Sequence, residues 1–248
     1  MEIDRKLKIL YTSAYKFIQE KIGQKSLDEK LDYYRGDYKV ETMEDVYWQL
    51  LSSLTNKRGM MRTIGNIDAL GPYLFDFNPA LTHEHYKNDW GKLFKVIKEN
   101  YTPPGRMNED GYWGVFVRGA VSGASFLSQF RSFPAFDEFV DNFTTNDISL
   151  GGLPLLIEQE IYGMGFPLAC DFLKEIGYKR YSKADIHLKT ILYECGIVDM
   201  DDYEIFNAVV RMGRVVDELP VVVDSVLWLI GSERLRDVFI EEVRGRLV

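Results

Sequence analysis

The sequence predicts an all-α protein, and three observations support this prediction. Apolar residues recur at helical spacing along nearly the whole chain of 248 residues. Capping residues, first-turn prolines and terminating glycines divide that pattern into segments of ordinary helix length. Strand-like alternation is rare, and Val221–Val223 is the only run of three β-branched residues. We therefore expect about a dozen helices.

In the N-terminal part, the helix boundaries follow from local chemistry. Residues 3–22 carry apolar side chains at helical spacing, and Gly23 is a natural stop. The polar stretch 31–41 is expected to be a linker. Thr42-Met-Glu-Asp45 is a capping-box type start for an apolar helix that reaches Leu54.

The middle of the chain is less regular. Helices are expected at 60–71, which Gly71-Pro72 ends, and near 88–99. The breaker Pro103-Pro-Gly105 precedes a helix at 111–130, whose glycines and alanines allow close packing against other helices. A further helix is expected at 134–143.

In the C-terminal half, prolines mark helix starts. Pro154 is expected in the first turn of a short helix that ends near Glu160, and Pro167 in the first turn of a helix that Gly177 ends. Apolar periodicity then predicts helices at 186–195, 201–217, 220–230 and 232–246.

Composition restricts the class of protein. There is no apolar run long enough to cross a bilayer, and the charged start does not resemble a signal peptide, so we expect a cytoplasmic protein without a membrane partner. Cys170 and Cys195 lie in apolar helical patterns and are expected to be buried free thiols. Two cysteines cannot build a four-cysteine zinc or iron–sulfur site.

Charge also limits the partners. The formal net charge of −8 argues against avid, non-specific DNA binding, because such binding depends on Lys and Arg displacing counterions. Local basic clusters remain compatible with an acidic body. The candidates are Lys57-Arg58 with Arg62, Lys174, and Lys179-Arg180 with Lys183.

The most informative stretch of the chain is Ile161-Tyr-Gly-Met-Gly165, which lies between two expected helices. Ala169 follows, and then Asp185-Ile-His187. Glycines allow positive φ and close approach, so such a turn can present bare backbone N–H groups to a phosphate. Taken alone, a Gly-x-Gly pair is also compatible with a plain turn between helices, and Asp185 with a simple N-cap.

Together these residues resemble the helix-hairpin-helix motif and following aspartate of the DNA glycosylase superfamily. The resemblance is detailed between Glu160 and Leu188, where the spacing fits without a gap. It implies a two-lobed helical bundle or barrel. One lobe, 42–185, would be the helical barrel that carries the hairpin at about 154–177, and residues 1–41 with 186–248 would form the second helical lobe.

The resemblance also implies a function, namely hydrolytic removal of a damaged or mispaired base that is flipped out of double-stranded DNA. Asp185 would be the catalytic carboxylate. Gly163, Met164, Gly165 and Lys183 would hold the DNA backbone. Pro167 occupies the position where the lyase members carry an amine nucleophile, so the resemblance implies a monofunctional glycosylase.

Further residues are candidates for a base pocket in the helix 111–130. Tyr112 and Trp113 could stack on a base, although aromatic residues at helical spacing are more often part of a core. Arg118 is unusual in this apolar helix and would either contact DNA or pair with a buried carboxylate. Lys183 would alternatively be a solvated lysine, and His187 is expected to be structural.

No cofactor is implied by the resemblance, apart from room for a structural monovalent cation at the hairpin. His83-Glu-His85 is not expected to hold a metal, because its spacing does not place both rings on one helix face. We expect a monomer. The alternative function is a catalytically inactive DNA-binding or scaffold protein of the same fold; a third option is an all-α domain in which the hairpin is coincidental.

Overall fold

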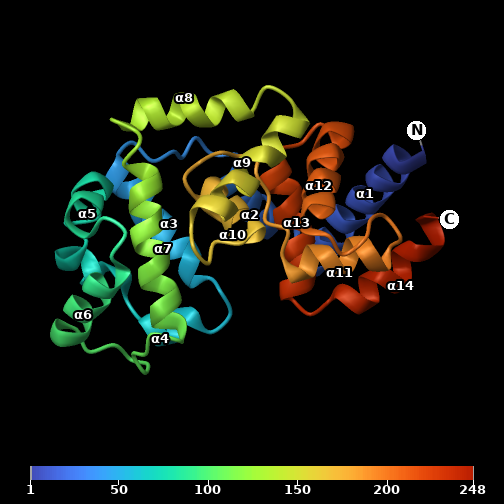
Figure 1. Ribbon diagram of the computed structural model, residues 1–248. Helices are drawn as coiled ribbons and strands as arrows, with labels where there is room; N and C mark the ends of the chain where they lie inside the picture. The colour runs from blue at the N-terminus through green and yellow to red at the C-terminus, as the bar shows by residue number, and fades with distance from the viewer. Residues whose placement is uncertain (1, 248) are drawn as a thin grey trace. The chain divides into compact units, whose positions relative to one another are not determined.

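A computed structural model describes residues 2–247, and within this range the chain contains helices and no strand (Figure 1). The expected all-α class is confirmed. Contacts between Cα atoms divide the chain into two compact units. We call residues 39–176 the central unit, and residues 1–38 with 177–248 the terminal unit. The second division follows Ile176, so the hairpin lies in the central unit and Asp185 in the terminal unit.

Within the central unit, α7 (Tyr112–Leu127) packs against most of the other helices. The remaining elements are α3 (Met43–Thr55), α4 (Met60–Ile64), the 3₁₀ helix η1 (Ile67–Tyr73), α5 (Pro79–Tyr86), α6 (Trp90–Asn100), α8 (Phe133–Phe143), α9 (Asp147–Glu160) and α10 (Phe166–Glu175). Small residues of α7 permit its contact with α3, because a Cβ atom on Gly123 would come within 2.9 Å of Leu50. The buried Tyr47 hydroxyl donates to the Ala120 carbonyl at 2.8 Å and joins the same two helices.

The terminal unit is built around α13 (Pro220–Ser232), which is apolar on nearly every face. The surrounding helices are α1 (Glu2–Ile22), α2 (Gln24–Arg35), α11 (Ile186–Glu194), α12 (Asp202–Val216) and α14 (Arg236–Leu247). A helix that is hydrophobic all round is stable only when it is covered, and these five helices supply the cover. The Val221–Val223 run therefore lies in a helix.

Two expected boundaries were wrong in the N-terminal half of the chain. The stretch 31–41 is helical as far as Arg35, because Leu27 and Leu31 place α2 on the core of the terminal unit. The expected helix 60–71 is divided at Gly65, which has a φ of 83°. The backbone at Gly65 also passes so close to Pro104 that a Cβ atom would lie 2.8 Å from that ring.

The helix before the hairpin is also longer than we expected. It starts at Asp147, because the Asn146 side chain accepts from the Ser149 N–H while the Ser149 hydroxyl accepts from the Asn146 N–H. This capping box sets the start of the helix and outweighs the later start that Pro154 predicts. Pro154 is instead tolerated inside the helix, where it is buried. The first helix of the hairpin is thus anchored well before the turn.

No helix in residues 2–247 combines the length and the apolar character that crossing a bilayer requires.

Candidate nucleic-acid interface

The turn between α9 and α10 has its apolar side chains inside and its glycines partly outside. Ile161 and Met164 are buried, and so is Ala169 in the first turns of α10. The Met164 N–H donates to the Ile161 carbonyl at 3.1 Å, which closes the turn. Gly163 has a φ of 79°, a conformation that residues with a Cβ atom rarely adopt.

Two N–H groups of this turn remain open. Within residues 2–247, no hydrogen bond joins the N–H of Gly163 or of Gly165 to an acceptor. Both glycines are partly exposed, so a ligand can satisfy these donors. Gly165 precedes the first turn of α10, where the helix dipole favours a negative charge. The turn therefore has the chemistry of an anion site.

One face of α7 holds the turn in place. Val115, Arg118, Gly119 and Ser122 recur at helical spacing along this face. The Ser122 hydroxyl accepts from the Tyr162 N–H at 2.9 Å and donates to the Arg118 carbonyl at 2.8 Å.

Gly119 on the same face allows the close approach, since a Cβ atom there would lie 2.9 Å from the Tyr162 carbonyl oxygen and 2.4 Å from a Leu54 methyl group. Leu54 on α3 is fully buried beneath the turn. The position of the hairpin is consequently set by two other helices of the central unit.

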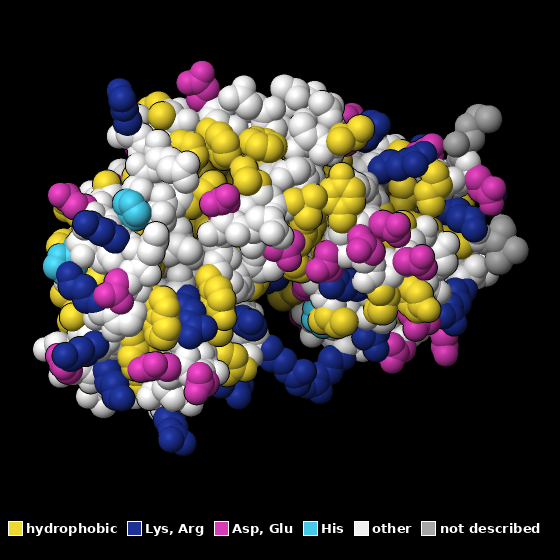
Figure 2. Space-filling model, in the orientation of Figure 1, with side chains coloured by type: hydrophobic (Ala, Val, Ile, Leu, Met, Phe, Trp, Pro, Cys, Tyr) yellow, Lys and Arg dark blue, Asp and Glu magenta, His cyan; other side chains and the backbone are white. Residues whose placement is uncertain are grey.

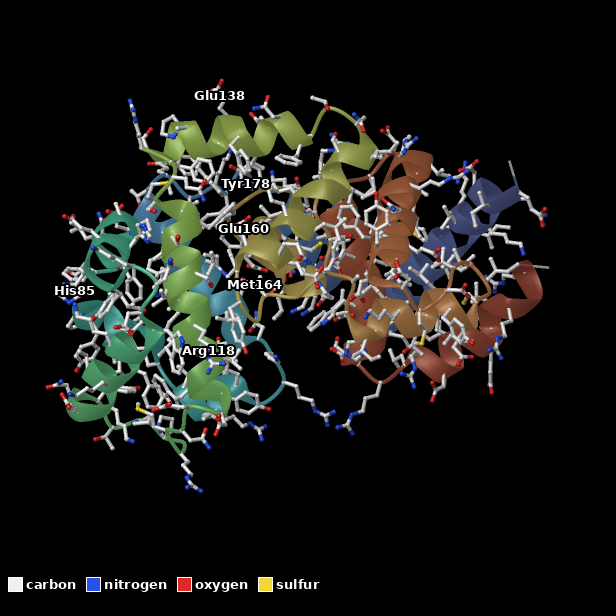
Figure 3. All side chains as sticks on the ribbon, in the orientation of Figure 1. His85, Arg118, Glu138, Glu160, Met164 and Tyr178 are labelled. Atoms are coloured by element: carbon white, nitrogen blue, oxygen red, sulfur yellow. The ribbon has the colours of Figure 1, made fainter. Side chains whose placement is uncertain are left out.

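Arg118 lies between two aromatic rings beside the turn. Its guanidinium is 4.2 Å from the ring centroid of Trp90 and 5.4 Å from that of Tyr162, and Nη1 donates to the Tyr162 hydroxyl at 3.2 Å. Figure 3 labels Arg118 in front of α7, and Figure 2 shows basic atoms flanked by hydrophobic side chains in that region. No carboxylate pairs with Arg118 in the described part of the chain, and its buried Nε has no partner there. The pairing that we considered from the sequence is therefore not what holds this side chain.

The three residues expected in a base pocket have three different surroundings. Trp113 is fully buried and packs against Tyr101 and Phe116, so it has no surface to offer a ligand. The Tyr112 hydroxyl donates to the Arg58 carbonyl at 2.6 Å and fastens the loop between α3 and α4. Only Arg118 lies beside the hairpin.

Sequence reasoning missed Trp90, which stacks on Arg118. Its position directly after the N-cap Asp89 predicts a helix start and says nothing about a partner far away in the sequence. Tyr162 was quoted only as part of the glycine turn, with no role assigned to its side chain. Its ring and its N–H both contact α7.

Basic side chains gather on the loop between α3 and α4 and on α4 itself. Lys57, Arg58 and Arg62 are exposed and line a hollow of about 530 Å³ together with Thr55, Asn56, Gly59 and Met61. None of the three cations forms an ion pair with another group in residues 2–247. The loop therefore offers uncompensated positive charge in a protein of net charge −8.

Asp185 caps α11 in the terminal unit. Its Oδ1 accepts from the N–H groups of His187 at 2.8 Å and Leu188 at 3.1 Å. The side chain is partly exposed, and Oδ2 accepts no hydrogen bond from the described residues. The cap and an available carboxylate oxygen thus coexist in one side chain.

The segment before Asp185 is fastened to α13. The buried Asp224 accepts from the Lys183 N–H at 2.9 Å, and the Lys183 side chain is partly exposed. After Asp185, the His187 ring lies against Gly231, where an added Cβ atom would come within 2.4 Å of the imidazole. His187 therefore packs closely against α13.

Residues 2–247 contain no group of three His, Cys, Asp or Glu side chains placed to hold a metal ion. The pair His83 and His85 lies on α5 without a third such ligand.

No family of proteins, curated protein or solved structure matches this chain.

Proposed function

We propose that this protein binds double-stranded DNA and hydrolyses the N-glycosidic bond of a damaged or mispaired base. The observation that carries the proposal is the pair of unsatisfied glycine N–H groups at a turn whose apolar residues are buried. Asp185, with one carboxylate oxygen free, follows this turn in the sequence at the spacing of the glycosylase pattern.

The turn would hold the DNA by its backbone. The N–H groups of Gly163 and Gly165 would donate to phosphate oxygens, with Met164 buried beneath them as a support. Contacts to phosphate fix the register of a protein on a duplex without reading its sequence. The stacked Arg118 would add a cation beside this phosphate or contact a base, and Lys183 would contact the backbone.

Asp185 would act on the sugar of the flipped nucleotide. Cleavage of the N-glycosidic bond develops positive charge on the sugar, and a carboxylate beside that carbon stabilises it. The same carboxylate can orient or deprotonate a water molecule, which adds to the sugar carbon as the base leaves with a proton. Pro167 has no amine, so water is the nucleophile in this scheme.

The second candidate is a DNA-binding protein of the same fold without this chemistry. Specific observations favour it. Glu158 lies near the turn, with Oε1 3.9 Å from the position of a Cβ atom on Gly165, and Glu160 is exposed at the end of α9. These carboxylates oppose a phosphate. Salt-dependent duplex binding without release of any base selects this candidate.

The test is base release from duplexes that carry uracil, hypoxanthine, alkylated purines, 8-oxoguanine or a mismatch. We expect the wild type to release at least one base and Asp185→Asn to release it about 10²–10⁴-fold more slowly. Asparagine is also a good N-cap, so this variant keeps α11 in place.

The matched control is Asp201→Asn, because Asp201 caps α12 of the same unit in the same way and accepts from the Glu204 N–H at 2.9 Å. Equal loss in both variants, or unchanged release by Asp185→Asn, removes Asp185 from the catalytic role. Absence of duplex binding even at low salt removes DNA from the proposal altogether.

A further inference from the structure

A second site lies wholly within the terminal unit, in a groove of about 270 Å³ between α2 and α13. Three aromatic or charged side chains of α2 face it, and three residues of α13 complete it. The lining residues are Lys30, Tyr33, Tyr34, Ser225, Trp228 and Leu229.

Helix geometry explains why these residues share one groove. On each helix the three lining residues follow the i, i+3, i+4 pattern, which places them on one face. Leu27 and Leu31 place α2 on the core, and Tyr34 is partly buried against the same core, whereas Lys30 and Tyr33 are exposed. The exposed Tyr33 side chain is therefore not part of the core packing of α2.

The aromatic rings remain in contact with water. Tyr33 is 68% exposed and Trp228 is 44% exposed. The rings of Tyr33 and Tyr34 stand at 85° to one another with centroids 5.2 Å apart, so they form two perpendicular walls. Clustered exposed aromatic side chains are typical of a binding site, and ring faces suit a planar ligand.

The charge in the groove is positive. Lys30 is the one charged residue of α2 that, within residues 2–247, has no ion pair or side-chain hydrogen bond. The others are engaged in the pairs Lys25–Glu29, Asp28–Gln24 and Asp32–Arg35. The lining also offers the Tyr33 hydroxyl and the Trp228 indole N–H, and it contains no carboxylate.

These features select the chemistry of the ligand. A cation beside aromatic faces disfavours a quaternary ammonium group, which would be repelled by Lys30. The volume of the groove lies below the range of about 300–1,000 Å³ that is typical of pockets for larger organic ligands. A ligand with one ring system therefore fits. The ligand expected here joins a planar ring to a negatively charged group.

We propose that this groove binds a nucleotide, with the base against Tyr33 and Trp228 and the phosphate at Lys30. Stacking of a base on an aromatic side chain is tolerant of base identity, because every base has a π face. The nucleotide is either free or an unpaired unit of a strand. The inference does not depend on the hairpin or on Asp185.

The experiment is calorimetric titration of the full-length protein with thymidine 5′-monophosphate, thymidine and inorganic phosphate. We expect saturable binding of the nucleotide, and weaker binding of both thymidine and phosphate. Trp228→Ala and Lys30→Glu should each weaken nucleotide binding about tenfold. Tyr33→Ala is a further variant on a largely exposed side chain, so its folding is not at risk.

The matched controls are Tyr193→Ala, an exposed tyrosine outside the groove, and Lys25→Glu, another lysine of α2. Both should bind the nucleotide as the wild type does. The proposal is overturned by absence of nucleotide binding, by equal affinity for thymidine and its monophosphate, or by binding that the three groove variants leave unchanged.

A short oligodeoxythymidine distinguishes the two sources of the ligand. Loss of its binding in Trp228→Ala assigns the groove to an unpaired unit of a strand. Oligonucleotide binding that Trp228→Ala does not weaken, together with weakened monophosphate binding, assigns it to the free nucleotide. Both results support the nucleotide site.

Discussion

The N–H of Gly165 can be removed without changing the backbone that carries it. Gly165 has a φ of −74°, which lies in the range of proline, and its N–H makes no hydrogen bond within residues 2–247. We expect Gly165→Pro to weaken duplex binding about 10–10²-fold, because a charge-assisted hydrogen bond contributes roughly 1.5–3 kcal/mol. Electrophoretic mobility shifts with a lesion-free duplex measure this change.

Gly165→Ala is the matched control, since it keeps the N–H. A Cβ atom at Gly165 meets neighbours only at 3.9 Å and beyond, so alanine fits. Equal weakening by alanine and proline would show that the N–H does not hold the DNA. Gly163 is unsuited to this design, because its Cβ atom would lie 2.7 Å from Val115.

Cys195 gives a prediction about pH. Burial raises the pKa of its thiol from 9.0 to about 11. The folded state therefore favours the neutral thiol, and this contribution to stability is complete below pH 9 and is lost as the pH rises toward 11. A pKa shift of two units corresponds to a contribution of roughly 2–3 kcal/mol to the free energy of unfolding.

The measurement is urea unfolding of the wild type and of Cys195→Ala between pH 7 and pH 11. The difference between their unfolding free energies should shrink above pH 9. A constant difference across this range would contradict the prediction. Comparing the two proteins cancels the other groups that titrate there, including Tyr11, whose pKa burial also raises.

The short segment that leads into α11 depends on α13 for its position. Asp224 is buried on α13 and accepts from the Lys183 N–H, two residues before Asp185. Removing this acceptor would leave a part-buried N–H unsatisfied, at a cost of about 1–3 kcal/mol. We expect Asp224→Ala to lower the unfolding free energy by that amount and to slow base release about tenfold or more.

Asp224→Asn keeps an acceptor oxygen and should restore most of the release rate. Single-turnover kinetics with saturating protein separate the rate of release from binding. If alanine and asparagine variants release the base equally fast as the wild type, Asp224 has only a role in stability.

For the whole protein, the salt dependence expected of the proposed DNA binding follows from the charge of the chain. The net charge is −8, so binding must rely on local cations such as Lys57, Arg58 and Arg62. Neutralising three phosphates contributes a slope of about −2.7 to a plot of log affinity against log salt. Replacing all three residues by glutamine should make the measured slope shallower by about that amount.

A matched triple variant carries glutamine at three exposed lysines of the terminal unit, Lys8, Lys16 and Lys25. Both triple variants change the net charge equally. If the slope becomes shallower by the same amount in both triple variants, the salt dependence comes from the overall charge. That result would contradict the prediction that Lys57, Arg58 and Arg62 contact the phosphates.

Much of the helical architecture could be predicted from local signals. The spacing of Leu7, Leu10, Ala14 and Phe17 in α1, the cap at Thr42 and the proline in the first turn of α10 each act within one helical turn. The errors arose where distant packing, or a stronger local cap, competes with such signals. Leu27 and Leu31 make α2 helical by burying its apolar face, and the Asn146 capping box carries α9 through Pro154.

The sequence alone determined that this protein is all-α, and it located the glycine turn and the capping aspartate. It could do so because helix periodicity, capping and glycine conformation depend on residues that are neighbours in the chain. Only the tertiary structure decided that Arg118 lies between Trp90 and Tyr162, that Trp113 is buried, and that Tyr33 and Trp228 share a groove. These pairings join residues far apart in the chain. They depend on how whole helices pack, which no local pattern encodes.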